Sequence, residues 1–450
     1  MAKFEKNLSE GNVVKQLILF SLPVLISNLI QSLYSTVDML VVGQFCGTNS
    51  MSGVNIGGQV SFLMTNMVFG LSVGATVLIG QYMGANDRKN IRKTIATLFL
   101  SLFIAAIAIT IITIGLQTPI LKLIQTPKES FSEAKIYFFI SMLGTIFIFG
   151  YNALSAVMRG MGDSKNPLIF VTIACVTNII LDLILVAWFK MGAAGAAIAT
   201  VVSQALSMLL CIVYLKRNNF IFDFKLSSFK EANMKNLRLI LKIGIPTSIQ
   251  NVAVSTSFLF LTALVNSISV TASAAVGAVG KLNGFAILPG VAMSTSVSAM
   301  AAQNIGAGKY DRARNTMLVG MTIATIISAV IFAVVAIFPE YCIGLFGNDP
   351  ELIKCGVKYM QAFKYDYFVA PLCFCFNGLF IGAGKTKFSL INGIMSSLLF
   401  RIPASWLFGM VMNMGLYGVG LGAPIASGAS LLFCIIFFFC GTWKSKAIQA

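Results

Sequence analysis

Two aspartates, Asp38 and Asp182, lie inside stretches whose composition is otherwise that of membrane-spanning helices. The chain of 450 residues contains no histidine and only 15 acidic residues. A charged side chain at the centre of a bilayer costs at least about 2.5 kcal/mol, so such residues are rare and usually functional. The two carboxylates are therefore candidates for an ion or proton site. Without histidine, proton transfer near neutral pH would have to use carboxylates.

The spacing of Asn178 and Asp182 supports this hypothesis. The two residues are four positions apart, so they share one face of a helix. Carboxylate and amide oxygens are hard ligands, which suit a hard cation such as sodium. Two carboxylates held close together in a low dielectric cannot both stay ionised and unpaired, so the site could bind a proton instead. The sequence leaves sodium and proton open.

The elements that must position these residues are membrane-spanning helices. Hydrophobic residues make up 57% of the chain and charged residues 10%, whereas a soluble domain has about 25% charged residues. Crossing the hydrocarbon core takes about 20 apolar residues in a helix, which satisfies its own backbone. The pattern predicts an all-α membrane protein with twelve transmembrane helices. They are expected at residues 17–43, 54–80, 94–116, 136–158, 167–189, 193–215, 239–266, 274–302, 316–338, 359–381, 388–411 and 416–441.

The basic residues predict the orientation of these helices. On the predicted topology, 23 of the 32 lysines and arginines lie on the side of the N-terminus, and six lie on the opposite side. The positive-inside rule therefore predicts a multi-pass protein of the plasma membrane with both termini in the cytoplasm. The net charge of +17 comes from residues that flank spans, so no nucleic-acid partner is expected. The nine cysteines are scattered and are interpreted as small apolar residues.

The chain also repeats itself. Residues 79–94 resemble residues 301–316 at a constant offset of 222, and Pro23 and Pro246 match at an offset of 223. Six spans in each half would insert both halves the same way up, which predicts two parallel six-helix repeats around a central cavity. The expected organisation is an N-terminal lobe at 1–215, a basic cytoplasmic linker at 216–238 and a C-terminal lobe at 239–450.

These patterns resemble the multidrug and toxic compound extrusion (MATE) family, over nearly the whole chain. The resemblance implies a twelve-helix exporter of cationic or amphiphilic compounds, driven by inward flow of sodium or protons. It is greatest to the prokaryotic branch that includes the DNA-damage-inducible exporters. The motifs that carry the resemblance are Pro23 to Gly47 with Asp38, Gly80 to Ala85, Met158 to Ser164, and Gln303 to Arg314.

The resemblance further implies a cation site in the first half of the chain. The family pattern has an aspartate on the first span, an Asn-x-x-x-Asp pair on the fifth and a threonine on the sixth. Here the matching residues are Asp38, Asn178, Asp182 and Thr200. Their oxygens would form a cage for Na⁺ or a proton. No other cofactor is expected.

The internal repeat provides a comparison for this cage. Aligned by the local offsets, the second half carries side chains without suitable oxygens at all four positions. These are Leu261, Phe400, Ala404 and Ala423. The glycines, prolines and basic anchors recur, and the predicted ligands do not. This contrast favours a functional role over helix packing, although divergence after duplication could produce it too.

Two further groups of residues are candidates for binding. Aromatic and methionine surface suits amphiphilic cations. Gln31, Tyr34, Asn152 and Met158 are therefore candidates for a substrate cavity, although each also fits ordinary packing. The second group lies in the second half and consists of Lys281, Lys364, Asp366 and Arg401. We expect Asp366 to pair with one of these bases, with a second ion or substrate site as the alternative.

The sequence leaves three other functions as alternatives. A lipid-linked saccharide flippase would need a basic cavity for its diphosphate, and only three basic residues fall within spans. An ion channel would need a selectivity filter, and no such motif appears. An enzyme is not expected, because no nucleophile–base set or phosphate loop appears. The chain is expected to act as a monomer that contacts membrane lipid and small amphiphilic or cationic substrates.

Overall fold

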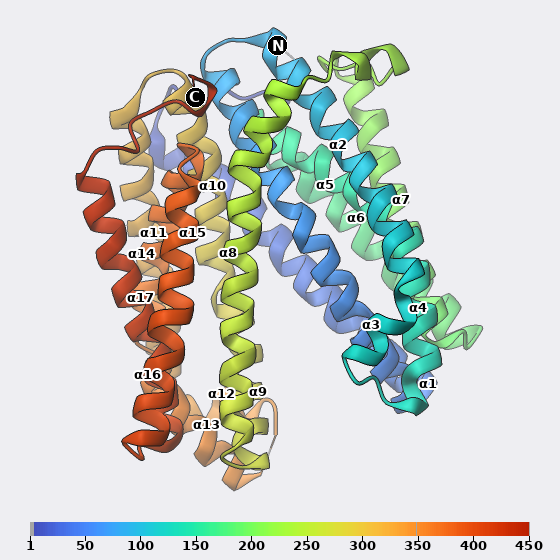
Figure 1. Cartoon of the computed structure of the whole chain (residues 1–450), viewed down its shortest axis with the longest axis vertical. Helices are drawn as coiled ribbons and strands as arrows, with labels where there is room; N and C mark the ends of the chain where they lie inside the picture. Colours follow the sequence, from blue (N-terminus) through green and yellow to red (C-terminus); the bar gives the residue numbers. More distant parts are fainter. Residues whose placement is uncertain (1–3, 348, 450) are drawn as a thin grey trace. The chain divides into compact units, whose positions relative to one another are not determined.

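The computed structural model of the chain describes residues 4–347 and 349–449, which are almost entirely helical (Figure 1). These residues form two compact units. Unit 1 consists of residues 4–7 and Ile26–Ile245, and unit 2 consists of Leu8–Leu25 and residues 246–449. Neither unit contains a β-strand in the part of the chain described. The prediction of an all-α fold is confirmed.

The two units exchange short segments of chain. Helix α1 (Val13–Gly84) passes from unit 2 to unit 1 after Leu25, and α8 (Met234–Asn266) passes from unit 1 to unit 2 after Ile245. The segment expected as a linker, 216–238, belongs to unit 1, where Glu231 forms an ion pair with Arg92 at 2.8 Å. The units therefore differ from the predicted lobes, 1–215 and 239–450, in these segments. The lobes themselves stay a prediction.

The first half of the chain folds into seven α-helices, one π-helical segment (η2) and two short 3₁₀ helices (η1, η3). Besides α1 they are α2 (Arg88–Gly115), α3 (Gln117–Leu123), η1 (Lys128–Ser130), α4 (Phe131–Leu143), α5 (Thr145–Gly160), α6 (Lys165–Asp182), η2 (Leu183–Trp188), α7 (Gly192–Arg217) and η3 (Leu226–Glu231).

The second half follows the same order, with two π-helical segments (η4, η5). Its helices are α8, α9 (Val270–Ala286), α10 (Leu288–Gly306), α11 (Tyr310–Ile337), α12 (Pro339–Gly344), α13 (Pro350–Phe363), α14 (Asp366–Gly382), α15 (Thr386–Ile394), η4 (Met395–Arg401), α16 (Ile402–Trp406), η5 (Leu407–Val411), α17 (Gly415–Phe439) and the 3₁₀ turn η6 (Ala447–Gln449). Within unit 2, α14 packs against α10, α11 and α17 (Figure 1).

The membrane-spanning helices agree with the twelve predicted spans. In the described ranges, ten helices are long and apolar enough to cross a membrane, and two bent helix pairs raise the number to twelve. α1 supplies two of the ten, because Gly47 at φ 81° interrupts its helical backbone. The bent pairs are Lys128–Leu143 with Thr145–Gly160, at 50°, and Pro350–Phe363 with Asp366–Gly382, at 48°.

The internal contacts show that the halves share one scaffold. Gly160 lies against the carbonyl of Thr76, and Gly382 lies against the carbonyl of Ser298. These two contacts are related by the same offset of 222 that relates the repeated sequence segments. Both glycines leave no room for a Cβ, since it would lie 2.9 or 2.6 Å from those carbonyl oxygens. The close packing of the second span against the fourth therefore recurs in the eighth and tenth.

Further along the chain the offset rises by one. Gly195 packs against Leu185, and Gly418 packs in the same way against Phe408, so the offset here is 223. Between the regions of lower and higher offset lies η4, a π-helical segment where the first half has regular α-helix. A π-turn accommodates one extra residue in a helix. The second half therefore carries a one-residue insertion within η4.

Candidate functional site

The carboxyl groups of Asp38 and Asp182 lie within hydrogen-bonding reach of each other inside unit 1. Asp38 belongs to α1 and is 6% exposed, and Asp182 ends α6 and is 0% exposed. Directly after Asp182 the α-helix changes into the π-helix η2, a kind of turn that often occurs at functional positions. The structure therefore brings together the two aspartates that the sequence singled out.

One oxygen of each aspartate has no partner. The Oδ1 atoms of Asp38 and Asp182 are buried and accept no hydrogen bond from the described residues. Buried polar atoms are normally satisfied, and two ionised carboxylates in contact repel each other. A proton or a cation between the two groups removes both costs. Among the described residues, no cluster of three or more His, Cys, Asp or Glu side chains could hold a metal ion. Carboxylate oxygens are hard ligands, which suit a hard cation such as sodium.

Asn178 orients this pair of carboxylates. Its side chain is 0% exposed and lies one turn before Asp182 on α6. The amide nitrogen donates to Asp182 Oδ2 at 3.0 Å, and the amide oxygen accepts from the backbone N–H of Thr200 at 3.2 Å. The opposite orientation would place the amide oxygen against a carboxylate. The sequence predicted Asn178 as an oxygen ligand of a cation, and this role stays a prediction. In this conformation its oxygen accepts from the Thr200 backbone and its nitrogen contacts Asp182.

Two tyrosines complete the surroundings of the pair. The Tyr34 hydroxyl donates to Oγ1 of Thr200, one of the four predicted cation ligands, at 2.8 Å. A role for Tyr34 in a substrate cavity stays a prediction. Tyr137 is 7% exposed, and its hydroxyl lies near the side chains of Thr200 and Ser141. Sequence reasoning missed Tyr137. The repeat could have found it, because Tyr359 stands at the matching position of the second half, at the offset of 222.

The other three predicted cavity residues of unit 1 differ in their exposure and contacts. Gln31 is exposed on α1. Asn152 donates to the backbone carbonyl of Ile148 at 2.9 Å, one turn earlier in α5. Met158 is 0% exposed and so offers no surface to a substrate in this conformation. A role for these residues in substrate binding stays a prediction.

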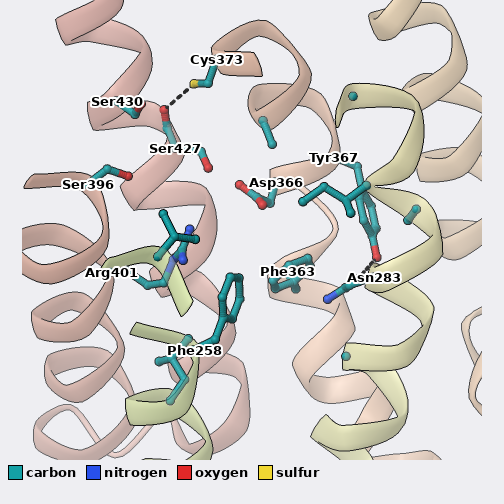
Figure 2. A pocket seen from close by; sticks show the side chains of 18 of the residues that line it. Phe258, Asn283, Phe363, Asp366, Tyr367, Cys373, Ser396, Arg401, Ser427 and Ser430 are labelled. Atoms are coloured by element: carbon teal, nitrogen blue, oxygen red, sulfur yellow. Dashed lines mark hydrogen bonds between the residues drawn. The ribbon is translucent and has the colours of Figure 1, made fainter. Parts of the chain in front are cut away.

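The second group of candidates separates into two kinds. Lys281 is exposed on α9, and the Lys364 ammonium lies 5.7 and 5.6 Å from the ring centroids of Phe332 and Tyr365. Asp366 and Arg401 instead line a cavity of about 660 Å³ within unit 2 (Figure 2). Asp366 forms no ion pair with any of the three bases, all of which belong to the described chain. The expected structural pairing of Asp366 is therefore absent from this conformation.

The insertion in η4 corrects the comparison of the two halves. The offset of 223 that holds after η4 pairs Asp182 with Ser405, and extended to the last residue of η4 it pairs Asn178 with Arg401. The sequence comparison had aligned them with Phe400 and Ala404, one residue too early, because the hydropathy pattern does not reveal a π-turn. The matched position of Asn178 is thus a charged residue, and that of Asp182 carries a hydroxyl, which donates to the carbonyl of Val419 at 3.0 Å.

Comparison with known proteins matches each half of the chain to the same family model. The family model described as MatE matches residues 23–184 and 246–407, and both ends of the second match follow those of the first at the offset of 223. The probable multidrug resistance protein YpnP of Bacillus subtilis (strain 168) is 29% identical over 440 residues, covering 98% of each chain. The probable multidrug resistance protein NorM of Thermotoga maritima is 27% identical over 446 residues, covering 96% of this chain and 94% of that one.

Solved structures share the fold. A structure described as the outward-facing conformation of a multidrug resistance MATE family transporter of the MOP superfamily superimposes with a TM-score of 0.88 at 23% identity, covering 98% of this chain and 97% of the other. A crystal structure of MATE in complex with MaL6 gives a TM-score of 0.89 at 22% identity, with 97% of both chains covered. The twelve-span architecture with two repeats is therefore that of these transporters.

Proposed function

Since this chain belongs to the MATE family of membrane transporters, we propose that it exports cationic or amphiphilic drugs from the cell in exchange for sodium ions or protons. The names of its relatives, which are multidrug resistance and multidrug export proteins, support drug export. They favour it over the lipid-linked saccharide flippase considered above. Transport, rather than catalysis of a covalent reaction, is also in keeping with a family of transporters.

The observation that carries the coupling is the buried pair of Asp38 and Asp182. Both carboxylates have an unpartnered oxygen, and they lie close enough to share a proton or a cation. When the pair captures a cation from outside, its negative charge is reduced by one and the contacts of α1 with α6 and α7 can change. In our proposal this capture favours release of the drug to the outside, and the return of the protein carries the ion inward.

The orientation of the transporter follows from the basic residues. The loops predicted on the side of the N-terminus carry most of the lysines and arginines. We therefore place both termini in the cytoplasm and the protein in the plasma membrane. Inward flow of sodium or protons then runs opposite to the export of drug, as antiport requires.

The substitution Asp182→Asn tests the coupling. It keeps the size of the side chain and removes the charge that the cation neutralises, so ethidium efflux driven by a sodium or pH gradient should be lost. Asp311→Asn is a matched control, because Asp311 is exposed in the first turn of α11, outside the site. Efflux is measured in vesicles, and folding is measured by thermal unfolding of the purified variants.

Sodium and proton are distinguished by imposing each gradient alone on the wild-type vesicles. A sodium gradient at equal pH drives efflux if sodium is the coupling ion, and a pH gradient without sodium drives it if the proton is. Efflux at the wild-type rate in Asp182→Asn under both gradients would refute the site.

A further inference from the structure

The cavity of unit 2 occupies the place that corresponds to the cation site of unit 1. Among the residues lining the cavity are Leu261 and Arg401, which match Asp38 and Asn178, and Tyr359, which matches Tyr137. The packing around these positions also recurs. Val42, Tyr137, Ala193 and Ala196 form one core cluster in unit 1, and the matching positions form one in unit 2: Val265, Tyr359, Leu416 and Val419.

Arg401 is a buried cation without an ion pair. It is 8% exposed at the end of η4, and its Nη1 donates to the neutral hydroxyl of Ser257 at 2.9 Å. Its guanidinium carbon lies 4.4 Å from the ring centroid of Phe258, while Nε is buried and has no hydrogen-bond partner among the described residues. A guanidinium stays charged at all physiological pH values, and burying it without a counter-charge is costly. The site is therefore incomplete without an anion.

The second charged residue of the cavity wall has the opposite sign. Asp366 and Arg401 project into the same open space from α14 and η4 (Figure 2). The Asp366 Oδ1 atom is buried and has no partner among the described residues, and the side chain of Ser427 lies beside this carboxylate. Because the two charges do not form an ion pair, each is available to an opposite charge on a ligand. The cavity thus offers one anion position and one cation position.

The remaining wall suits an aromatic ligand of drug size. Phe258, Phe363 and Phe374 line the cavity beside Arg401 and Asp366. On α9, Gly277, Gly280 and Gly284 share one helix face, and a Cβ at any of them would meet nothing within 4 Å. These glycines keep the cavity open. Its volume of about 660 Å³ is in the range of small-molecule sites.

We propose that this cavity binds a zwitterionic aromatic amphiphile, with the ligand's carboxylate on Arg401 and its ammonium group near Asp366. Arg401 can offer a carboxylate two parallel N–H donors, a geometry that a compact ammonium cannot provide. The phenylalanines pack against the aromatic body. The inference deepens the proposed function by naming a substrate class, and it rests on that function only for export, since binding needs no ion gradient.

The test compares an acid with its ester on the purified full-length protein in detergent. Norfloxacin carries a carboxylate and an amine, and its methyl ester keeps only the amine. The wild type should bind the acid about tenfold more tightly than the ester, the size expected for a charge-assisted pair. Equal affinity for the two compounds overturns the proposal without requiring any variant.

Variants then assign the preference to a residue. Arg401→Gln should lower the affinity for the acid about tenfold and leave the affinity for the ester unchanged, so that the preference for the acid disappears. Lys354→Gln is the matched control, since it removes a cation from an exposed position of the same unit that does not line the cavity. Asp366→Asn should weaken the binding of acid and ester alike. A full acid preference in folded Arg401→Gln, or its loss in Lys354→Gln, contradicts the proposal.

A filling variant examines the cavity independently of charge. Gly280→Leu places a side chain where a Cβ has free space, so the variant should fold. The added side chain should fill part of the cavity and weaken the binding of both compounds. Unchanged binding of both in this variant would place the ligand elsewhere and overturn the proposal. The outcome is separable from that of the proposed function: Asp182→Asn, which should stop efflux, should keep the acid preference in detergent.

Discussion

One set of matched scaffold positions carries two carboxylates in unit 1 and a guanidinium in unit 2. In unit 1, Asn178 holds a pair of carboxylates in orientation, and the buried site is negative. In unit 2, the position of Asn178 is taken by Arg401, which has no ion pair within the described chain, and Asp38 and Asp182 are matched by the uncharged Leu261 and Ser405. The surrounding packing, including Tyr137 and Tyr359, is the same. The difference teaches that a duplicated helical scaffold can change the charges at matched interior positions through a few side chains.

The largest effect is expected from moving the charge of unit 2 into unit 1. In Asn178→Arg, a tethered guanidinium would lie beside Asp38 and Asp182 and take the place of the mobile cation. An opposite charge at contact distance should lower the apparent affinity for sodium or protons about 100-fold. The measurement is the thermal unfolding temperature as a function of sodium concentration and of pH. The wild-type unfolding temperature should rise with the concentration of the coupling cation, and in the variant this rise should require about 100-fold more sodium or protons.

Asn178→Gln is the control for this substitution, because it keeps the amide and changes only its reach. It should retain a cation dependence that is weakened but measurable. If Asn178→Arg folds and still responds to the cation as the wild type does, the charge at this position does not decide the polarity of the site, and the comparison between the units fails.

Some features of the fold and of the two sites could be predicted from the hydropathy and charge pattern of the sequence, and others could not. The twelve spans followed from apolar runs of about 20 residues, and Asp38 and Asp182 stood out as charges within them. The insertion in η4 could not be seen in the sequence, because one extra residue in an apolar helix hardly changes the hydropathy pattern. Since the alignment slipped by one residue there, Arg401 was compared with the wrong position, and its relation to Asn178 was invisible.

The orientation of side chains was likewise beyond the sequence. An asparagine can accept through oxygen or donate through nitrogen, and only its neighbours, Asp182 and the Thr200 backbone, decide between the two. Asp366 illustrates the same limit. The sequence supplied three bases as partners, yet its carboxylate lies in the wall of a cavity, at the start of the helix that follows a bend of 48°.

A smaller effect should distinguish the units by stability. Asn178→Ala leaves Asp182 Oδ2 and the Thr200 N–H without their partner, which should lower the free energy of unfolding by about 1–3 kcal/mol. Arg401→Met keeps the length of the side chain and removes a buried charge, so it should be neutral or stabilising by about 1 kcal/mol. Unfolding of both variants is followed in the same detergent. An equal loss of stability in both would show that Arg401 is as well satisfied as Asn178, contrary to the comparison.

The smallest effect concerns the matched tyrosines. Tyr137→Phe removes a hydroxyl near Thr200, whose own hydroxyl also receives a hydrogen bond from Tyr34. The loss of one hydrogen bond, about 1 kcal/mol, should weaken the binding of the coupling cation about fivefold. Tyr359→Phe removes the matching hydroxyl beside Arg401 and should leave the cation dependence of unfolding unchanged. Tyr137 and Tyr359 have the same packing and differ in the charge that they face. If both substitutions weakened cation binding equally, the cation response would therefore not belong to unit 1 alone.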